Sequence, residues 1–279
     1  MMSREKREKT RPYKNKTTLT VYLVLRALII VAMVRALLLG NYESVFLCAL
    51  SLILLLLPSI LQKQLYISLP STLEIFILLF IFAAEILGEL GSFYVRVPNW
   101  DTMLHTVNGF LCAAVGFALV DMINRNERFS LKLSPVYLAL VAFCFSMTVG
   151  VMWEFFELCA DKFVGLDMQK DTVVTAIGSV TLDPTASNKV IRVKDIADVI
   201  IVHSDGSTQA LGLGGYLDIG LYDTMKDLLV NFVGAVVFSV IGYFYVKAEG
   251  KGKFASQFIP QVPMESEIEM HQAETDRHP

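Results

Sequence analysis

Apolar residues in this chain gather in long continuous blocks separated by short polar stretches. Six blocks stand out, at 18–39, 44–61, 71–90, 102–122, 136–160 and 224–246. An apolar stretch of ~20 residues spans a bilayer as an α-helix, which satisfies its backbone polar groups within the segment. Membrane β-strands would instead alternate apolar and polar residues over short segments. The pattern predicts an all-α polytopic membrane protein, a bundle of six transmembrane helices.

Three polar regions accompany the predicted membrane domain, 18–247. Residues 1–17 form a basic segment, and 248–279 form a polar tail that we expect to be disordered or loosely attached. The 161–223 segment has β-branched runs on both sides of Asp205-Gly206, which predicts a small β-hairpin outside the membrane. His203, beside that turn, is expected to be solvated.

Composition supports the membrane assignment and narrows the partners. The chain is 54% hydrophobic with a mean hydropathy of +0.54, and its net charge of −3 argues against a nucleic-acid partner. Membrane lipid is therefore the expected surrounding. The cysteines all fall inside apolar blocks without forming a CxxC pair, so we interpret them as small packing residues: Cys48, Cys112, Cys144 and Cys159.

Lys and Arg positions predict the orientation in the membrane. The 1–17 segment carries seven of them, and basic residues accumulate in short cytoplasmic segments. Alternation across six helices then places both termini in the cytoplasm and 161–223 outside the inner (plasma) membrane. The first block contains Arg26 and Arg35 and no small-residue cleavage site follows it, so it is predicted to be a retained helix, not a signal peptide.

Polar side chains in the blocks concentrate at the predicted outer ends of four helices. The deepest lie roughly 12 Å inward, and on three of the four helices the set covers an arc of only about 60–80°. The set comprises Glu85, Glu89, Asp101, His105, Asn108, Glu154, Glu157, Asp161, Asp223, Asp227 and Asn231. We therefore predict one polar site near the outer surface.

Carboxylates outnumber basic residues at this predicted site. A charge in the membrane core costs at least ~2.5–3.5 kcal/mol, so these acids must share a cation, share protons or pair with Lys or Arg. The candidate catalytic residues are the inner ones: His105, Glu154, Glu157, Asp227 and Asn231. His105, Glu154 and Asp227 are the candidate ligands of a divalent metal, with Mg²⁺, Mn²⁺ and Zn²⁺ equally compatible.

The outermost acids have a simpler interpretation. Glu89, Asp101, Asp161 and Asp223 lie at the block ends, where solvation or helix capping accounts for a carboxylate. Asp101 has an alternative role, since it precedes His105 by four residues and can orient the imidazole as a general base.

Two segments of the chain are alike. "WDTMLHTVNGF" and "YDTMKDLLVNF" each give an aromatic residue, Asp-Thr-Met, and then a polar residue four positions after the Asp. Each follows a helix that ends in spaced glutamates. The two helix pairs are therefore candidates for direct repeats around a central site, an arrangement found in transporters.

These segments also carry a family resemblance. "LPSTLEIFILLFIFAAEILGEL", "WDTMLHTVNGF", "AFCFSMTVGVMWEFFE" and "DTMKDLLVNFVGA" resemble the YjdF-like family of bacterial inner-membrane proteins. That resemblance covers roughly 17–247 and implies a membrane location but no defined activity. A fainter similarity to VanZ-like membrane proteins lies in Asp101 with His105, and in Asp227 with Asn231 and Gly234. The long 161–223 insert departs from the compact VanZ-like form.

Three functions fit these observations. The first is a cation-dependent, membrane-embedded enzyme that acts on a lipid headgroup or envelope precursor. The second is a proton- or cation-coupled transporter, for which Glu74 and Asp121 near the inner ends, both expected to be interfacial, are the candidates for a path across the membrane. The third is a structural or assembly protein that docks an envelope partner through 161–223.

Overall fold

The fold is described from a computed structural model that covers residues 15–64, 68–125, 133–250, 252–253 and 255–259. The basic residues before 15, Arg128 and Lys132, and the tail beyond 259 lie outside the described residues. The chain forms two compact units, one of residues 1–150 and 230–279, the other of 151–229. Each unit is described by itself.

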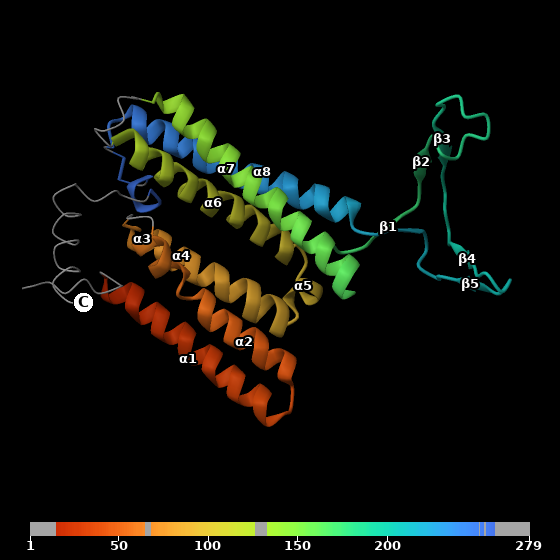
Figure 1. Cartoon of the computed structure of the whole chain (residues 1–279), viewed down its shortest axis with the longest axis horizontal. Coiled ribbons are helices and arrows are strands. Elements are labelled where there is room, and N and C mark those ends of the chain that lie inside the picture. The colour runs from red at the N-terminus through yellow and green to blue at the C-terminus, as the bar shows by residue number, and fades with distance from the viewer. Residues whose placement is uncertain (1–14, 65–67, 126–132, 251, 254, 260–279) are drawn as a thin grey trace, which may run out of the picture. The chain divides into compact units, whose positions relative to one another are not determined.

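The first unit begins with a helical hairpin. Helix α1 (Lys16–Leu38) and helix α2 (Tyr42–Leu54) are joined by a tight turn in which Gly40 has φ +71° (Figure 1). Asn41 begins α2 as its N-cap, because its side-chain oxygen accepts a hydrogen bond from the Ser44 amide at 3.0 Å. Helix α3 (Leu57–Gln64) follows α2 after a short turn.

The apolar block at 71–90 is helical throughout but changes type. Helix α4 (Ser71–Ile81) is α-helical, and the π-helix η1 (Phe82–Leu90) continues it without a break. A short helix, α5 (Phe93–Arg96), leads into the next long helix. Glu85 and Glu89 therefore lie on a π-helical segment, which the hydrophobic pattern does not distinguish from an ordinary helix.

Three long helices follow: α6 (Trp100–Arg125), α7 (Pro135–Cys159) and α8 (Leu221–Lys247). Within the described residues, five helices are long and apolar enough to cross a membrane, at Lys16–Leu38, Tyr42–Gln64, Trp100–Asp121, Pro135–Val164 and Leu221–Lys247. Five of the six predicted blocks thus correspond to such helices. The remaining block, 71–90, is the segment divided between α4 and η1.

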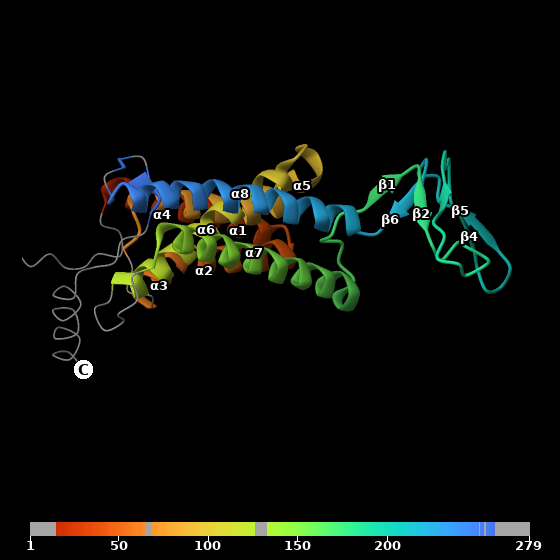
Figure 2. The ribbon, with the colours of Figure 1, turned by 90° about the horizontal axis from the view of Figure 1, so that it is seen from above.

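Helices α6 and α8 run parallel and in unusually close contact (Figures 1 and 2). A methyl group added at Gly109 would overlap the backbone carbonyl oxygen of Asn231, and one added at Gly234 would overlap that of Thr106. Small residues allow this approach, which is the usual way in which membrane helices associate. Further along the pair, Phe117 and Phe238 pack edge to face and are fully buried.

The described part of the polar tail, residues 255–259, packs against the first unit. The 3₁₀-helix η3 (Ala255–Gln257) presents Phe258 to two aromatic rings, Phe76 of α4 at 5.7 Å and Phe110 of α6 at 5.5 Å. Ile259 is only 1% exposed. The polar composition of the tail concealed these two apolar residues, whose burial holds the described part of the tail against α4 and α6.

The second unit carries short antiparallel strand pairs beyond the π-helix η2 (Ala160–Val164). The strands form three ladders: β1 (Thr172–Val174) with β6 (Tyr216–Asp218), β2 (Ile177–Ser179) with β3 (Ile191–Val193), and β4 (Ile200–Val202) with β5 (Thr208–Ala210). The turn between β4 and β5 contains Asp205-Gly206, with Gly206 at φ +84°. The side chain of His203, in the same turn, is exposed.

The loop between β2 and β3 is organised by one carboxylate. Asp183 accepts hydrogen bonds from the backbone amides of Thr185, Ser187 and Lys189, and from the Thr185 and Ser187 hydroxyls. These bonds, those of Thr185 first, hold the pKa of Asp183 well below its ordinary value.

This arrangement predicts a pH-dependent loop. Because the folded-state pKa is lowered, the stabilisation is fully present above the ordinary Asp pKa of about 3.9 and is lost as the pH falls through the folded-state value. At neutral pH, Asp183→Ala should abolish hydrogen-exchange protection of the Thr185, Ser187 and Lys189 amides, measured by mass spectrometry. The control Asp205→Ala should affect only its own turn, where Asp205 bonds Ser207. Unchanged protection in Asp183→Ala would contradict the prediction.

Candidate functional site

The first turns of α6 carry an acid and a histidine on one side of the helix. Asp101 and His105 are four residues apart, and His105 Nε2 lies 3.5 Å from Asp101 Oδ1. That distance is too long for a strong hydrogen bond. The other oxygen, Asp101 Oδ2, is buried and has no hydrogen-bond partner among the described residues. Asp101 therefore has acceptor capacity that His105 does not use.

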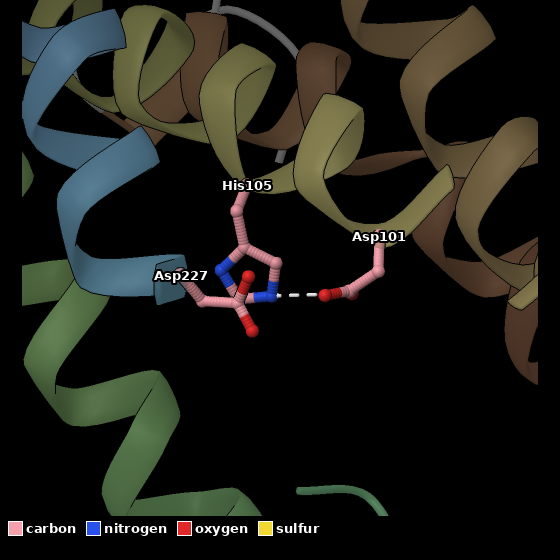
Figure 3. Close-up of side chains that lie close together, drawn as sticks. All are labelled: Asp101, His105 and Asp227. Carbon is pink, nitrogen blue, oxygen red and sulfur yellow. Dashed lines mark ion pairs between the residues drawn. The ribbon is translucent and has the colours of Figure 1, made fainter. Parts of the chain in front are cut away.

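Helix α8 adds a second carboxylate to this pair. Asp101, His105 and Asp227 each offer one ligand atom, and these atoms lie within 4.8 Å of one another (Figure 3). Asp227 is 1% exposed and His105 is buried. In a tetrahedral zinc site with bonds of about 2.1 Å, two ligand atoms lie about 3.4 Å apart. The three side chains are therefore close enough to converge on one ion after shifts on the order of an ångström.

Asparagines one turn further along α6 and α8 join the two helices. Asn108 donates to the side-chain oxygen of Asn231 at 3.3 Å, and Asn231 donates to the Ser146 carbonyl of α7 at 3.5 Å. Asn231 is almost fully buried, and Gly150 of α7 leaves room for its amide. Asn231, which we predicted as a site residue, therefore links three helices at the level below Asp227.

A lysine modifies the charge beside Asp227. Lys226 Nζ lies 3.8 Å from the Asp227 carboxylate and 3.3 Å from that of Asp223. Lys226 is half-exposed, so its ammonium group remains partly hydrated. Its distance from Asp227 is longer than that of an optimal ion pair.

The predicted glutamates of α7 do not belong to this group. Glu154 and Glu157 are both buried, and Glu157 accepts a hydrogen bond from Trp153 Nε1 at 2.8 Å. The group of three ligand atoms contains Asp101 where the sequence suggested Glu154. On η1, Glu85 is half-buried and Glu89 is exposed, and neither joins the group.

Two of the outermost acids bind backbone amides in the second unit. Asp161 accepts from the amides of Met168 and Gln169 at 2.6 and 2.9 Å. Asp223 accepts from the Lys170 amide at 2.8 Å. These bonds fix the chain that leads from α7 into the strands. The side chain of Gln169 donates to Thr224 at 2.6 Å. The sequence does not predict this role, because Gln169 belongs to no recognisable motif.

Glu74 and Asp121, which the sequence suggests are interfacial, are both buried within the first unit. Glu74 is 3% exposed and accepts a hydrogen bond from Gln62 at 3.0 Å. Asp121 is 4% exposed, near the C-terminal end of α6. It lies about 30 Å along that helix from Asp101, at 1.5 Å per residue. The burial arises because α4 and α6 pack into the core of the first unit.

Comparison with known proteins agrees with this helical membrane architecture. Residues 18–248 match the family described as "Predicted membrane protein (DUF2238)". The chain belongs to the DUF2238 family. The match covers α1 to the end of α8, so the whole candidate site lies within the DUF2238 region. The chain is thus a predicted membrane protein with several apolar helices.

A relative and the solved structures add little about chemistry. An uncharacterized protein of Thermotoga maritima is 23% identical over 107 residues, which are 38% of this chain and 53% of the relative. The chain thus spans about half the length of that relative. No solved structure matches the chain. The DUF2238 assignment therefore rests on sequence, and the site has to be interpreted from its own geometry.

Proposed function

We propose that the chain is a divalent-cation-dependent, membrane-embedded enzyme that acts on a lipid headgroup or envelope precursor. The observation that carries this proposal is the group of Asp101, His105 and Asp227, with ligand atoms within 4.8 Å of one another. Buried carboxylates at the end of membrane helices are costly unless they are paired or bind an ion, and intramembrane ionisable groups are usually functional.

The ligand set suits a catalytic ion. Two carboxylates and one imidazole leave coordination positions for water and substrate, as in three-ligand catalytic zinc sites. Such an ion lowers the pKa of bound water and polarises a phosphate or carbonyl oxygen. Zn²⁺ and Mn²⁺ both accept this mixed nitrogen and oxygen set.

The chain's own residues have separate tasks in this proposal. Asp101, His105 and Asp227 hold the ion, and the Asn108–Asn231 bond positions α6 against α8 one turn away. Lys226, at 3.8 Å from Asp227 and half-exposed, is placed to attract an anionic headgroup. Because α6 and α8 are membrane helices, a lipid reaches their ends by lateral diffusion, without a channel.

The finer architecture is part of the same proposal. We infer six transmembrane segments, with α4 and η1 together forming the one that the long helices do not include, and both termini in the cytoplasm. The site then faces the outer leaflet of the inner membrane. Within the DUF2238 family we propose a YjdF-like member, and the Asp101/His105 and Asp227/Asn231 spacing supports a distant VanZ-like relation.

Metal analysis tests the proposal. We expect the protein, purified in detergent and reloaded with Zn²⁺ or Mn²⁺, to retain about one ion per chain, the number that one three-ligand site holds. His105→Ala should weaken binding by at least ~10–100-fold, since even changes outside the ligand shell have that effect. His203→Ala, at an exposed loop histidine, is the matched control and should bind as the wild type does. Equal retention in both variants would overturn the metal site.

Transport is the second candidate, favoured by the burial of Glu74 and Asp121. Buried carboxylates distant from the outer site are what a cation relay needs. Proteoliposomes separate the two functions. A transporter takes up Mn²⁺ or protons and loses that uptake in Glu74→Gln, whereas an enzyme releases phosphate or headgroup from lipid without any ion gradient.

A further inference from the structure

A groove on the first unit begins at Phe232, little more than one helical turn beyond Asp227, and extends along α8 away from the candidate site. It runs between α7 and α8 and has a volume of about 560 Å³. Phe143 and Phe232 meet edge to face at one end, with ring centroids 5.4 Å apart. Val136, Tyr243 and Phe244 line the other end. The small side chain of Ser239 lines the groove between them and is itself buried.

The length of the groove matches one leaflet. From Phe232 to Phe244 is twelve residues of α8, or about 18 Å at 1.5 Å per residue. Half of a ~30 Å hydrocarbon core is ~15 Å. A transmembrane helix of a second copy would instead follow a seam across the whole core. The groove is therefore the right length for a single acyl chain.

One end of the groove lies beside a basic residue. At the end where α7 begins and α8 finishes, Lys247 is exposed and its Nζ lies 5.7 Å from the centre of the Tyr243 ring. The groove's lining contains no charged side chain. An open apolar groove of one leaflet's length with an ammonium group beside one end is complementary to a phospholipid that has an anionic headgroup.

We propose that this groove is a binding site for one anionic phospholipid, with an acyl chain between α7 and α8 and the phosphate near Lys247. In the orientation proposed above, the lipid belongs to the cytoplasmic leaflet, whose anionic lipids attract basic residues by about 1 kcal/mol each. The site is separate from the metal group and does not depend on the enzymatic proposal.

Filling the groove tests the acyl-chain part. Delipidated protein is mixed with dioleoylphosphatidylglycerol, and bound lipid is counted by native mass spectrometry. We expect one retained lipid for the wild type and none for Ala139→Trp, which places an indole in the groove. Val236→Trp fills the groove from α8 and provides an independent test if Ala139→Trp does not fold. Ala27→Trp, on the exposed face of α1, is the matched control and should retain the lipid.

Removing the charge tests the headgroup part. Lys247→Gln should weaken binding of dioleoylphosphatidylglycerol about fivefold and leave binding of dioleoylphosphatidylcholine unchanged. Lys63 is an exposed lysine on α3, and Lys63→Gln should change the binding of neither lipid. Equal lipid retention in the groove-filling variants and Ala27→Trp would overturn the site. So would a lipid-free dimer that dissociates in Ala139→Trp, since the groove would then bind a second copy of the chain.

Discussion

Alanine at Gly234 is expected to destabilise the protein by about 2 kcal/mol, although alanine is the better helix former by about 1 kcal/mol. The added methyl group would overlap the Thr106 carbonyl oxygen and approach the Phe110 amide nitrogen at 2.9 Å. Both obstacles are backbone atoms of α6, so no side chain can rotate away. The helices must separate, which weakens the Asn108–Asn231 bond and the packing around Phe238.

Gly242, two turns along the same helix, provides the control. Its added methyl group would meet the Phe117 ring at 3.0 Å, and a ring edge can tilt where a backbone carbonyl cannot. We expect Gly242→Ala to change stability by less than about 1 kcal/mol, because the gain in helix propensity offsets the tighter contact. Thermal unfolding in detergent measures both variants. Equal midpoints would show that close contact between α6 and α8 is not needed for stability.

The hydrophobic pattern predicts the long helices well because the physics of a bilayer leaves few alternatives. The predicted block 224–246 becomes α8 at Leu221–Lys247, and 18–39 becomes α1 at Lys16–Leu38. A hydropathy pattern cannot distinguish an α-helix from a π-helix, so the change at Phe82 was not predictable. Likewise, the docking of Phe258 and Ile259 depends on space between α4 and α6 that no local pattern describes.

For the candidate site, too, the sequence predicts some features and leaves those that depend on helix packing undetermined. Distance from the predicted outer helix ends placed Asp101, His105 and Asp227 near one membrane surface, and helix periodicity placed Asp101 and His105 on one face of their helix. Position alone favoured Asp101 as a helix-end acid and Glu154 as a ligand. The choice between them depends on how α6, α7 and α8 are rotated about their axes. Gly109, Gly150 and Gly234 set those contacts, and their partners are visible only in the structure.

Asp227 belongs to the ligand group in the structure, and we expect Asp227→Asn to lose most of the function. The substitution preserves the size of the side chain and removes its charge, so it affects ion binding more than packing. We expect activity to fall about 10²–10³-fold, as when a group that stabilises charge in a transition state is removed. Genetic complementation and metal content measure the effect together. Asp195→Asn is the matched control, since Asp195 has φ +55°, a conformation that Asn tolerates.

Asp101→Asn and Glu154→Gln then separate the two ligand sets. If the ion is held by Asp101, His105 and Asp227, Asp101→Asn should lose metal and function together, while Glu154→Gln keeps the metal. If Glu154 of α7 supplies the ligand instead, Glu154→Gln should lose metal and function while Asp101→Asn keeps the metal.

Metal occupancy in the wild type should also fall as the pH is lowered, because protons compete with the ion for the imidazole and the carboxylates. Full function in both Asp227→Asn and Glu154→Gln would leave docking of a partner on the second unit as the remaining function.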